Sequence, residues 1–136
     1  MADALGNSRG VDCALLIVRL SVGGLMLFHG VDKLQHGLAG IEGMLAAKGL
    51  PTALSYGVYV GEILAPVLLI LGLWTRVAAL VIAFDMFMAI FLARRGDVAK
   101  INPMSGGWAI ELELLFLIGA LALAFAGGGR FGLGKR

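Results

Sequence analysis

Cysteine is almost missing from this 136-residue sequence, in which Cys13 stands alone. One cysteine excludes an internal disulfide, a C-x-x-C redox centre and a disulfide oxidase that works through paired cysteines. The two histidines, His29 and His36, lie at one end of one predicted helix, so they cannot clamp opposite faces of a haem. No Walker or dinucleotide glycine loop and no zinc-ligand spacing is found. An enzyme that works alone is therefore not expected.

Charge is also scarce. Charged residues make up 15% of the sequence and hydrophobic residues 60%, whereas soluble domains contain about 25% and about 45–50%. The net charge of +2 is not gathered into a basic cluster interleaved with aromatics, so no nucleic-acid partner is expected. A small soluble domain could not bury so much apolar surface. The composition predicts an integral membrane protein with the lipid bilayer as its main partner.

The sequence instead contains long apolar runs. Each contains about 17–21 residues, and a helix needs roughly 20 to cross the hydrocarbon core. They cover residues 13–31, 54–74, 77–93 and 108–127. Because they lack the alternation of barrel strands, helices must satisfy their backbone groups in lipid. The predicted fold is all-α, a single membrane domain over residues 1–136 that forms a four-helix bundle.

The connections carry further signals. Within residues 38–48, the apolar side chains fall at helical spacing, which predicts a short amphipathic helix lying in the membrane interface between the first two spans. An irregular loop is the alternative for this segment. Residues 128–136 are rich in glycine and are predicted to form a flexible tail. Four spans place both termini on one side, but the loop charges are evenly divided and do not choose that side.

Small residues and one proline interrupt the first two predicted spans. Gly23 and Gly24 on the first, with Gly57 and Gly61 on the second, would let helix backbones approach closely. Pro66 lies one turn beyond Glu62 and frees a backbone carbonyl beside that carboxylate. Close packing within the chain is the predicted result.

Ionisable residues inside spans are costly, about 2.5–3.5 kcal/mol at the bilayer centre, so each is a candidate functional group. Arg19 and Asp85 lie roughly 9 and 12 Å deep, counted from the side of the termini at 1.5 Å per residue. Their similar depth predicts a structural ion pair between the first and third spans.

A second polar group lies toward the opposite side of the membrane. Its members are His29, Lys33, Glu62 and Glu111. Glu113 follows Glu111 by about 200° around the helix, so only one of the two can face the bundle centre. These residues are predicted to form a polar pocket between the first, second and fourth spans that holds a small ligand or relays protons. Alternatively, they pair only to fix the helix register.

Several loose motifs occur in a specific order along almost the whole chain. They are Arg19-x3-Gly23, His29-Gly30-x2-Lys33, Gly61-Glu62, Gly72-Leu-Trp-Thr-Arg76, and Glu111 followed by glycines 127–129 and Arg130. With these motifs the sequence resembles the DoxX family of small four-helix membrane proteins of bacteria and archaea. Many relatives end in Ser-x-Asp after the arginine, where this sequence has Gly132 and Gly134.

The resemblance implies a bacterial inner-membrane location with cytoplasmic termini and an association with respiratory or sulfur redox chemistry. Members of the family look like membrane subunits of quinone-reducing complexes. The matching positions here are Arg19, Lys33, Glu62 and Glu111.

The leading hypothesis is an accessory or anchor subunit of a membrane redox complex with a bound quinone. Lys33 and His29 would hydrogen-bond a quinone oxygen, and Glu62 and Glu111 would deliver protons. No cofactor is expected within the chain itself, so electrons would come from partner subunits; a homo-oligomer is the other expected assembly. The alternatives are a small-molecule or ion transporter and a purely structural membrane subunit.

Overall fold

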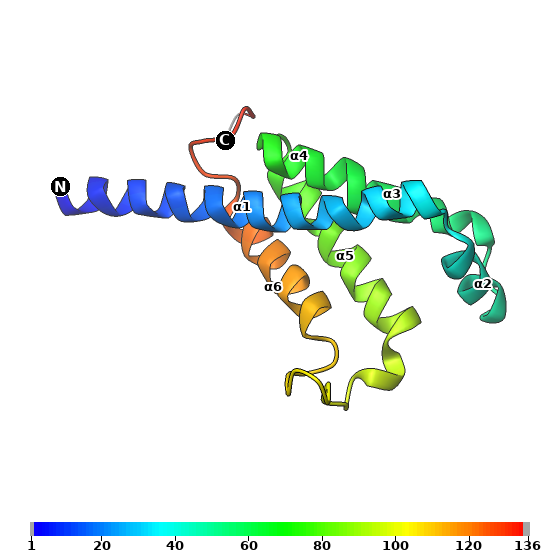
Figure 1. The fold of residues 1–136 in the computed structure, drawn as a ribbon. Helices are drawn as coiled ribbons and strands as arrows, with labels where there is room; N and C mark the ends of the chain where they lie inside the picture. Colours follow the sequence, from blue (N-terminus) through cyan, green and yellow to red (C-terminus); the bar gives the residue numbers. More distant parts are fainter. Residues whose placement is uncertain (1, 135–136) are drawn as a thin grey trace.

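The computed structural model describes residues 2–134, with side chains described from Ser8 onward, and its regular elements are helical (Figure 1). In chain order they are α1 (Ala2–His36), α2 (Ala39–Ala47), the 3-10 turn η1 (Thr52–Tyr56), α3 (Gly57–Tyr59), the π-helical turn η2 (Val60–Leu64), α4 (Ala65–Leu71), α5 (Thr75–Ala93), the 3-10 turn η3 (Arg95–Asp97) and α6 (Glu111–Ala126). The all-α prediction is confirmed for this part of the chain.

Within the described part of the chain, three helical segments are long and apolar enough to cross a membrane: Ser8–His36, Thr52–Leu71 and Thr75–Ala93. They correspond to the predicted spans 13–31, 54–74 and 77–93. The first helix begins well before its predicted start because no proline interrupts the residues ahead of it. Its 35 residues extend over about 52 Å, more than the roughly 30 Å of the hydrocarbon core.

The fourth apolar run forms a shorter helix than predicted. The run covers residues 108–127, whereas α6 has 16 residues, about 24 Å. Gly127 ends α6 with a φ of 83°, and Trp108 remains in the preceding loop. α6 packs closely along α5.

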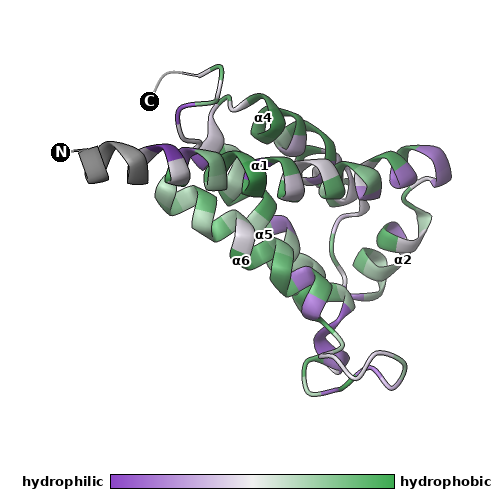
Figure 2. Cartoon of the chain, turned by 60° about the vertical axis from the view of Figure 1, so that its left-hand side comes forward, coloured by the Kyte–Doolittle hydropathy of each residue, from purple (hydrophilic) through white to green (hydrophobic). Residues whose placement is uncertain are grey.

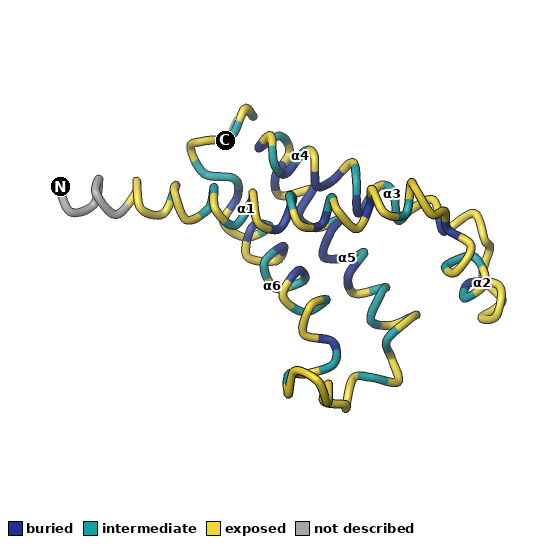
Figure 3. The backbone as a smooth tube through the Cα atoms, in the orientation of Figure 1, coloured by how far each residue is buried: buried dark blue, intermediate teal, exposed yellow. Residues whose placement is uncertain are grey.

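The helices pack as two crossing pairs. α1 lies beside α4, and the α5–α6 hairpin crosses them and splays away at its loop end (Figure 1). Figure 3 shows the buried backbone gathered where the two pairs cross. The core there contains Met26, Leu69, Ile82 and Leu123.

Most large apolar side chains face outward. Phe28 is 76% exposed and Phe125 is 82% exposed, and Figure 2 shows hydrophobic residues along all the long helices. Soluble monomers rarely expose apolar patches larger than a few hundred Å². The outer faces of the helices therefore contact the lipid bilayer.

The short helix between the first two spans is observed at Ala39–Ala47, within the predicted range 38–48. It packs on η1 and α5 and buries Leu45, and Leu38 is buried just before it. Gly49, with a φ of 71°, turns the chain after it.

The described part of the glycine-rich tail, residues 128–134, makes contacts with the helices. Leu133 N donates to Leu71 O at 3.0 Å, and Gly134 N donates to Gly72 O at 3.1 Å. A Cβ at Gly132 would lie 2.8 Å from Gly72 O, so a side chain there would prevent this approach. Residues 132–134 thus lie against the α4–α5 turn, Gly129 and Arg130 lie beside Asp12 of α1, and residues 135–136 fall outside the described part.

Candidate functional site

A pocket of about 150 Å³ lies between α1, η2, α5 and α6, toward the end of the bundle opposite the tail. Its polar wall comes from three elements and contains His29, Lys33, Glu62 and Glu113. Its apolar wall contains Met26, Met86, Ala89, Leu112 and Phe116. The pocket therefore combines donors and acceptors with an apolar surround.

Lys33 and Glu62 form the central contact of this site. Lys33 Nζ lies 2.5 Å from Glu62 Oε2, and the two side chains are 24% and 7% exposed. Tyr59 donates from its hydroxyl to Lys33 O at 3.3 Å. The structure therefore brings these two predicted site residues together across α1 and η2.

A π-helical turn places Glu62. The Ala65 N–H donates to Val60 O, five residues back, as in a π-helix. Pro66 has no N–H to offer the carbonyl of Glu62, four residues before it, so a regular α-helical bond cannot form there. A Cβ at Gly30 would collide with Glu62 O, which means that α1 can approach this carbonyl only through a glycine.

Asp85 of α5 belongs to the same polar group. Its side chain lies against Gly61, where a Cβ would be 2.7 Å from Asp85 Cβ. It interacts electrostatically with Glu62 and Lys33. Its Oδ2 atom is buried without a hydrogen-bond partner among the described residues.

The structure does not bring Arg19 and Asp85 together as the predicted ion pair. Arg19 instead donates from Nε to Leu69 O at 2.9 Å, from Nη2 to Ile70 O at 2.9 Å and from Nη1 to Gly128 O at 3.0 Å. Carbonyls in the last turn of a helix have acceptor capacity left, and the planar guanidinium fills it here, although Leu69 O also accepts from Gly72 N at 3.1 Å. Similar depth in the membrane did not imply contact.

The structure also separates Glu111 from the other predicted pocket residues. Glu111 is exposed and lies against Gly107, while Glu113 lines the pocket and is 20% exposed. The helical spacing showed that only one of the two could face inward, but the family resemblance selected Glu111. Nothing in the sequence alone distinguished them.

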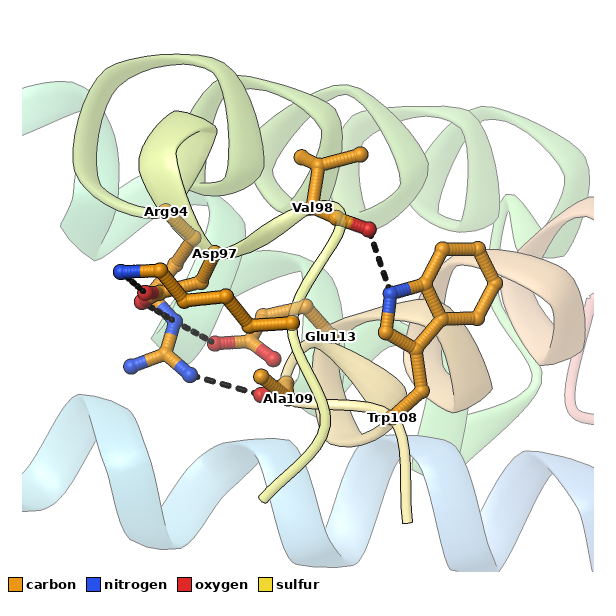
Figure 4. A network of polar contacts seen from close by, with 7 residues as sticks. Arg94, Asp97, Val98, Trp108, Ala109 and Glu113 are labelled. Atoms are coloured by element: carbon orange, nitrogen blue, oxygen red, sulfur yellow. Dashed lines mark hydrogen bonds and ion pairs between the residues drawn. The ribbon is translucent and has the colours of Figure 1, made fainter. Parts of the chain in front are cut away.

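Arg94 follows α5 directly and joins Glu113 of the pocket to the loop before α6 (Figure 4). Its Nη2 donates to Ala109 O at 2.6 Å, and its Nε lies 3.5 Å from Glu113 Oε1 and 3.4 Å from Asp97 Oδ2. In the same loop, Trp108 donates from Nε1 to Val98 O at 2.6 Å.

His29 completes the polar wall. Its ring meets Phe116 edge to face, with centroids 5.8 Å apart. No hydrogen bond from the described residues fixes its ring nitrogens. His29 can therefore donate to or accept from a ligand, depending on its tautomer.

The size and chemistry of the pocket restrict what it can hold. A cavity of 150 Å³ accepts a ligand of benzene size, whereas drug-sized ligands and cofactors occupy about 300–1,000 Å³. Lys33 supplies donors, and the carboxylates of Glu62 and Glu113 supply acceptors. A single polar ring fits this arrangement.

Comparisons with known proteins agree with the membrane architecture. The DoxX family model matches residues 14–95. An uncharacterized membrane protein of Mycobacterium tuberculosis is 31% identical, with 90% of this chain and 80% of that protein covered. An uncharacterized protein of Haemophilus influenzae is 33% identical, with coverages of 90% and 89%.

A Bacillus subtilis protein named "Putative oxidoreductase CatD" is 27% identical, with 88% of this chain and 84% of that protein covered. No solved structure matches the chain. The family match covers more than half of the sequence and includes Arg19, Lys33 and Glu62. The chain belongs to the DoxX family of membrane proteins.

Proposed function

We propose that this protein is an accessory or anchor subunit of a quinone-linked respiratory or sulfur redox complex, and that the pocket between α1, η2, α5 and α6 holds the quinone head group. The observation that carries the proposal is the pocket itself, which is ring-sized, apolar on one wall and lined by a Lys33–Glu62 ion pair on the other. The name of the Bacillus subtilis relative, "Putative oxidoreductase CatD", also supports a role in redox chemistry.

The residues present fit a quinone head. Its two carbonyl oxygens are acceptors, and Lys33 and His29 are the donors on the pocket wall. Met26, Met86 and Phe116 offer an apolar surface for the ring. A bound quinone would supply reversible two-electron chemistry, with electrons arriving from a partner subunit. The role of this chain is to bind and orient the ring and to take up and release protons at Glu62 and Glu113.

The same proposal includes the arrangement in the membrane. α6 is the fourth span of a four-helix bundle, its short length compensated by the polar loop before it, and α2 lies in the interface. Arg130 N donates to Asp12 Oδ1 at 2.9 Å, which supports placing the C-terminal tail on the same side as the start of the chain. We assign the protein to the bacterial inner membrane with that side cytoplasmic.

Quinone binding tests the proposal directly. The full chain is purified in lipid nanodiscs, and binding of trimethylbenzoquinone is measured by equilibrium dialysis. We expect saturable binding that weakens about tenfold in Lys33→Met, since a lost charged hydrogen bond contributes about 1.5–3 kcal/mol. Glu111→Gln, outside the pocket, is the matched control and should bind normally. Absence of saturable binding, with or without co-purified partner subunits, rejects the proposal.

Ion transport is the second candidate, favoured by the unpartnered Oδ2 of Asp85 beside Glu62 in the middle of the bundle. It predicts substrate-dependent proton flux in liposomes that Glu62→Gln abolishes. A purely structural role predicts that Glu62→Gln lowers thermal stability and changes neither quinone binding nor flux. Glu62→Gln therefore distinguishes ion transport from a purely structural role.

A further inference from the structure

Arg94 stands between two carboxylates without a close hydrogen bond to either. Its Nε is 3.4 Å from Asp97 Oδ2 and 3.5 Å from Glu113 Oε1. Nitrogen–oxygen hydrogen bonds are usually about 2.7–3.2 Å long, and this Nε is buried with no hydrogen-bond partner among the described residues. A small movement toward either carboxylate would satisfy the nitrogen.

The two carboxylates belong to different parts of the molecule. Glu113 lines the pocket. Asp97 lies on η3 in the loop, where Lys100 Nζ is 3.4 Å from its other oxygen. Arg94 itself is anchored by the bond from Nη2 to Ala109 O at 2.6 Å. The guanidinium is thus held at one edge, while its Nε lies between the carboxylates of Glu113 and Asp97 (Figure 4).

The pocket carboxylates also differ in how firmly they are held. Glu62 accepts from Lys33 at 2.5 Å, whereas among the described residues the polar contact of Glu113 is the longer one with Arg94. Glu113 is therefore the carboxylate with acceptor capacity left for a ligand. An ionised carboxylate accepts hydrogen bonds and donates none. A ring with hydroxyl groups suits it, and a ring with only carbonyl oxygens does not.

We propose that Arg94 is a positioning residue that couples the pocket to the 94–110 loop. When a hydroxylated ring donates to Glu113, Arg94 moves to Asp97 and the loop tightens. Glu113 thereby favours the reduced, hydroxylated form of the ring over the quinone. The identity of the ring rests on the proposed function, but the coupling is a separate claim about these three side chains.

Hydrogen exchange and binding test the coupling together. The full chain in anaerobic nanodiscs is compared with trimethylhydroquinone, with trimethylbenzoquinone and without a ligand. We expect the hydroquinone to slow amide exchange of residues 95–100 at least threefold, and the quinone to leave it unchanged. Asp97→Asn should weaken hydroquinone binding about fivefold without changing quinone binding. Glu113→Gln should lose the preference between the two rings.

Two matched controls are present in the chain. Glu111→Gln changes the neighbouring exposed carboxylate of α6, and Arg95→Gln changes an arginine that lies over the Phe91 ring, 4.0 Å from its centroid. Both should behave like the wild type. If both rings bind but Asp97→Asn and Glu113→Gln change nothing and loop exchange is constant, the coupling is rejected and the proposed function stands. If neither ring binds the wild type, the proposed function fails and this inference with it.

Discussion

Lys33 on α1 and Glu62 on η2 meet with 2.5 Å between Nζ and Oε2, beside a pocket inside the helix bundle. An isolated charge at mid-bilayer costs about 2.5–3.5 kcal/mol on insertion scales. Pairing offsets part of this cost for both groups, because each charge stabilises the other where water is excluded. The contact therefore joins two spans and keeps two charges within reach of a ligand.

Lys33→Met should destabilise the fold markedly. It leaves Glu62 buried without its partner, and breaking a buried ion pair in this way costs about 3–5 kcal/mol, with the lower end expected because Lys33 is partly exposed. The measurement is the apparent Tm in nanodiscs, followed by tryptophan fluorescence.

The control for this variant is Lys100→Met, which removes an exposed partner of Asp97 and should cost less than about 1 kcal/mol. Changing Lys33 and Glu62 together to methionine should recover most of the lost Tm, because two apolar side chains carry no unpaired charge. Equal Tm values for Lys33→Met and Lys100→Met would show that the Lys33–Glu62 pair contributes little.

Arg19→Met should release the C-terminal tail. Arg19 satisfies two carbonyls at the end of α4 and Gly128 O in the tail, and the loss of these bonds should cost at least about 2 kcal/mol. Trypsin cleavage after Arg130 should accelerate several-fold. Arg19→Lys should give an intermediate rate, since one ammonium cannot reproduce the planar fork. Wild-type cleavage rates in Arg19→Met would mean that the tail is held by other contacts.

Adjacent glycines of α1 should respond in opposite ways to alanine. A Cβ at Gly23 would lie 2.9 Å from Pro66 O, so Gly23→Ala forces α4 away and should cost about 1–3 kcal/mol. A Cβ at Gly24 meets nothing within 4 Å, so Gly24→Ala should be neutral or stabilise by up to about 1 kcal/mol. Apparent Tm values of the two variants check this, and a similar loss in both would contradict the packing of α1 on α4.

The sequence predicted the features that follow from composition and depth. Apolar runs of bilayer length identified the helical segments, since only helices satisfy backbone groups in lipid. The cost of charge in a span selected Glu62, while the place of Lys33 one turn beyond His29 and the family resemblance selected Lys33; the structure brings the two together. The predicted close packing at small residues is confirmed only in part. Gly61 lies against Asp85, whereas a Cβ at Gly57 or Gly24 would meet nothing within 4 Å.

The remaining features depend on backbone geometry that side-chain patterns do not encode. Arg19 donates to carbonyls at the end of α4. No sequence pattern predicts which backbone carbonyls will lie within reach of a given arginine side chain. The choice between Glu111 and Glu113 depends on the rotation of α6, which packing against α5 decides. The contacts of Arg94 depend on the fold of the loop, which places Ala109 O and Asp97 beside its guanidinium, and the sequence does not predict that loop conformation.

The placement of α6 as a fourth span makes a prediction about membrane topology. Cys13→Ser provides a cysteine-free background, into which single cysteines are introduced by Arg9→Cys, Ser105→Cys and Arg130→Cys, all at exposed positions. A membrane-impermeant maleimide is added to intact cells and, separately, to inside-out vesicles.

If α6 crosses the bilayer, the cysteines at positions 9 and 130 should react only in inside-out vesicles, and the cysteine at position 105 should react only in intact cells. The contact between Asp12 and Arg130 N already brings the two ends of the chain together, which favours this result. If positions 105 and 130 react from the same side, α6 does not span the membrane, and the pocket that it lines would lie at the edge of a three-span bundle. Labelling from one side alone at position 9 confirms that the vesicles are sealed, so the comparison between positions 105 and 130 decides between the two arrangements.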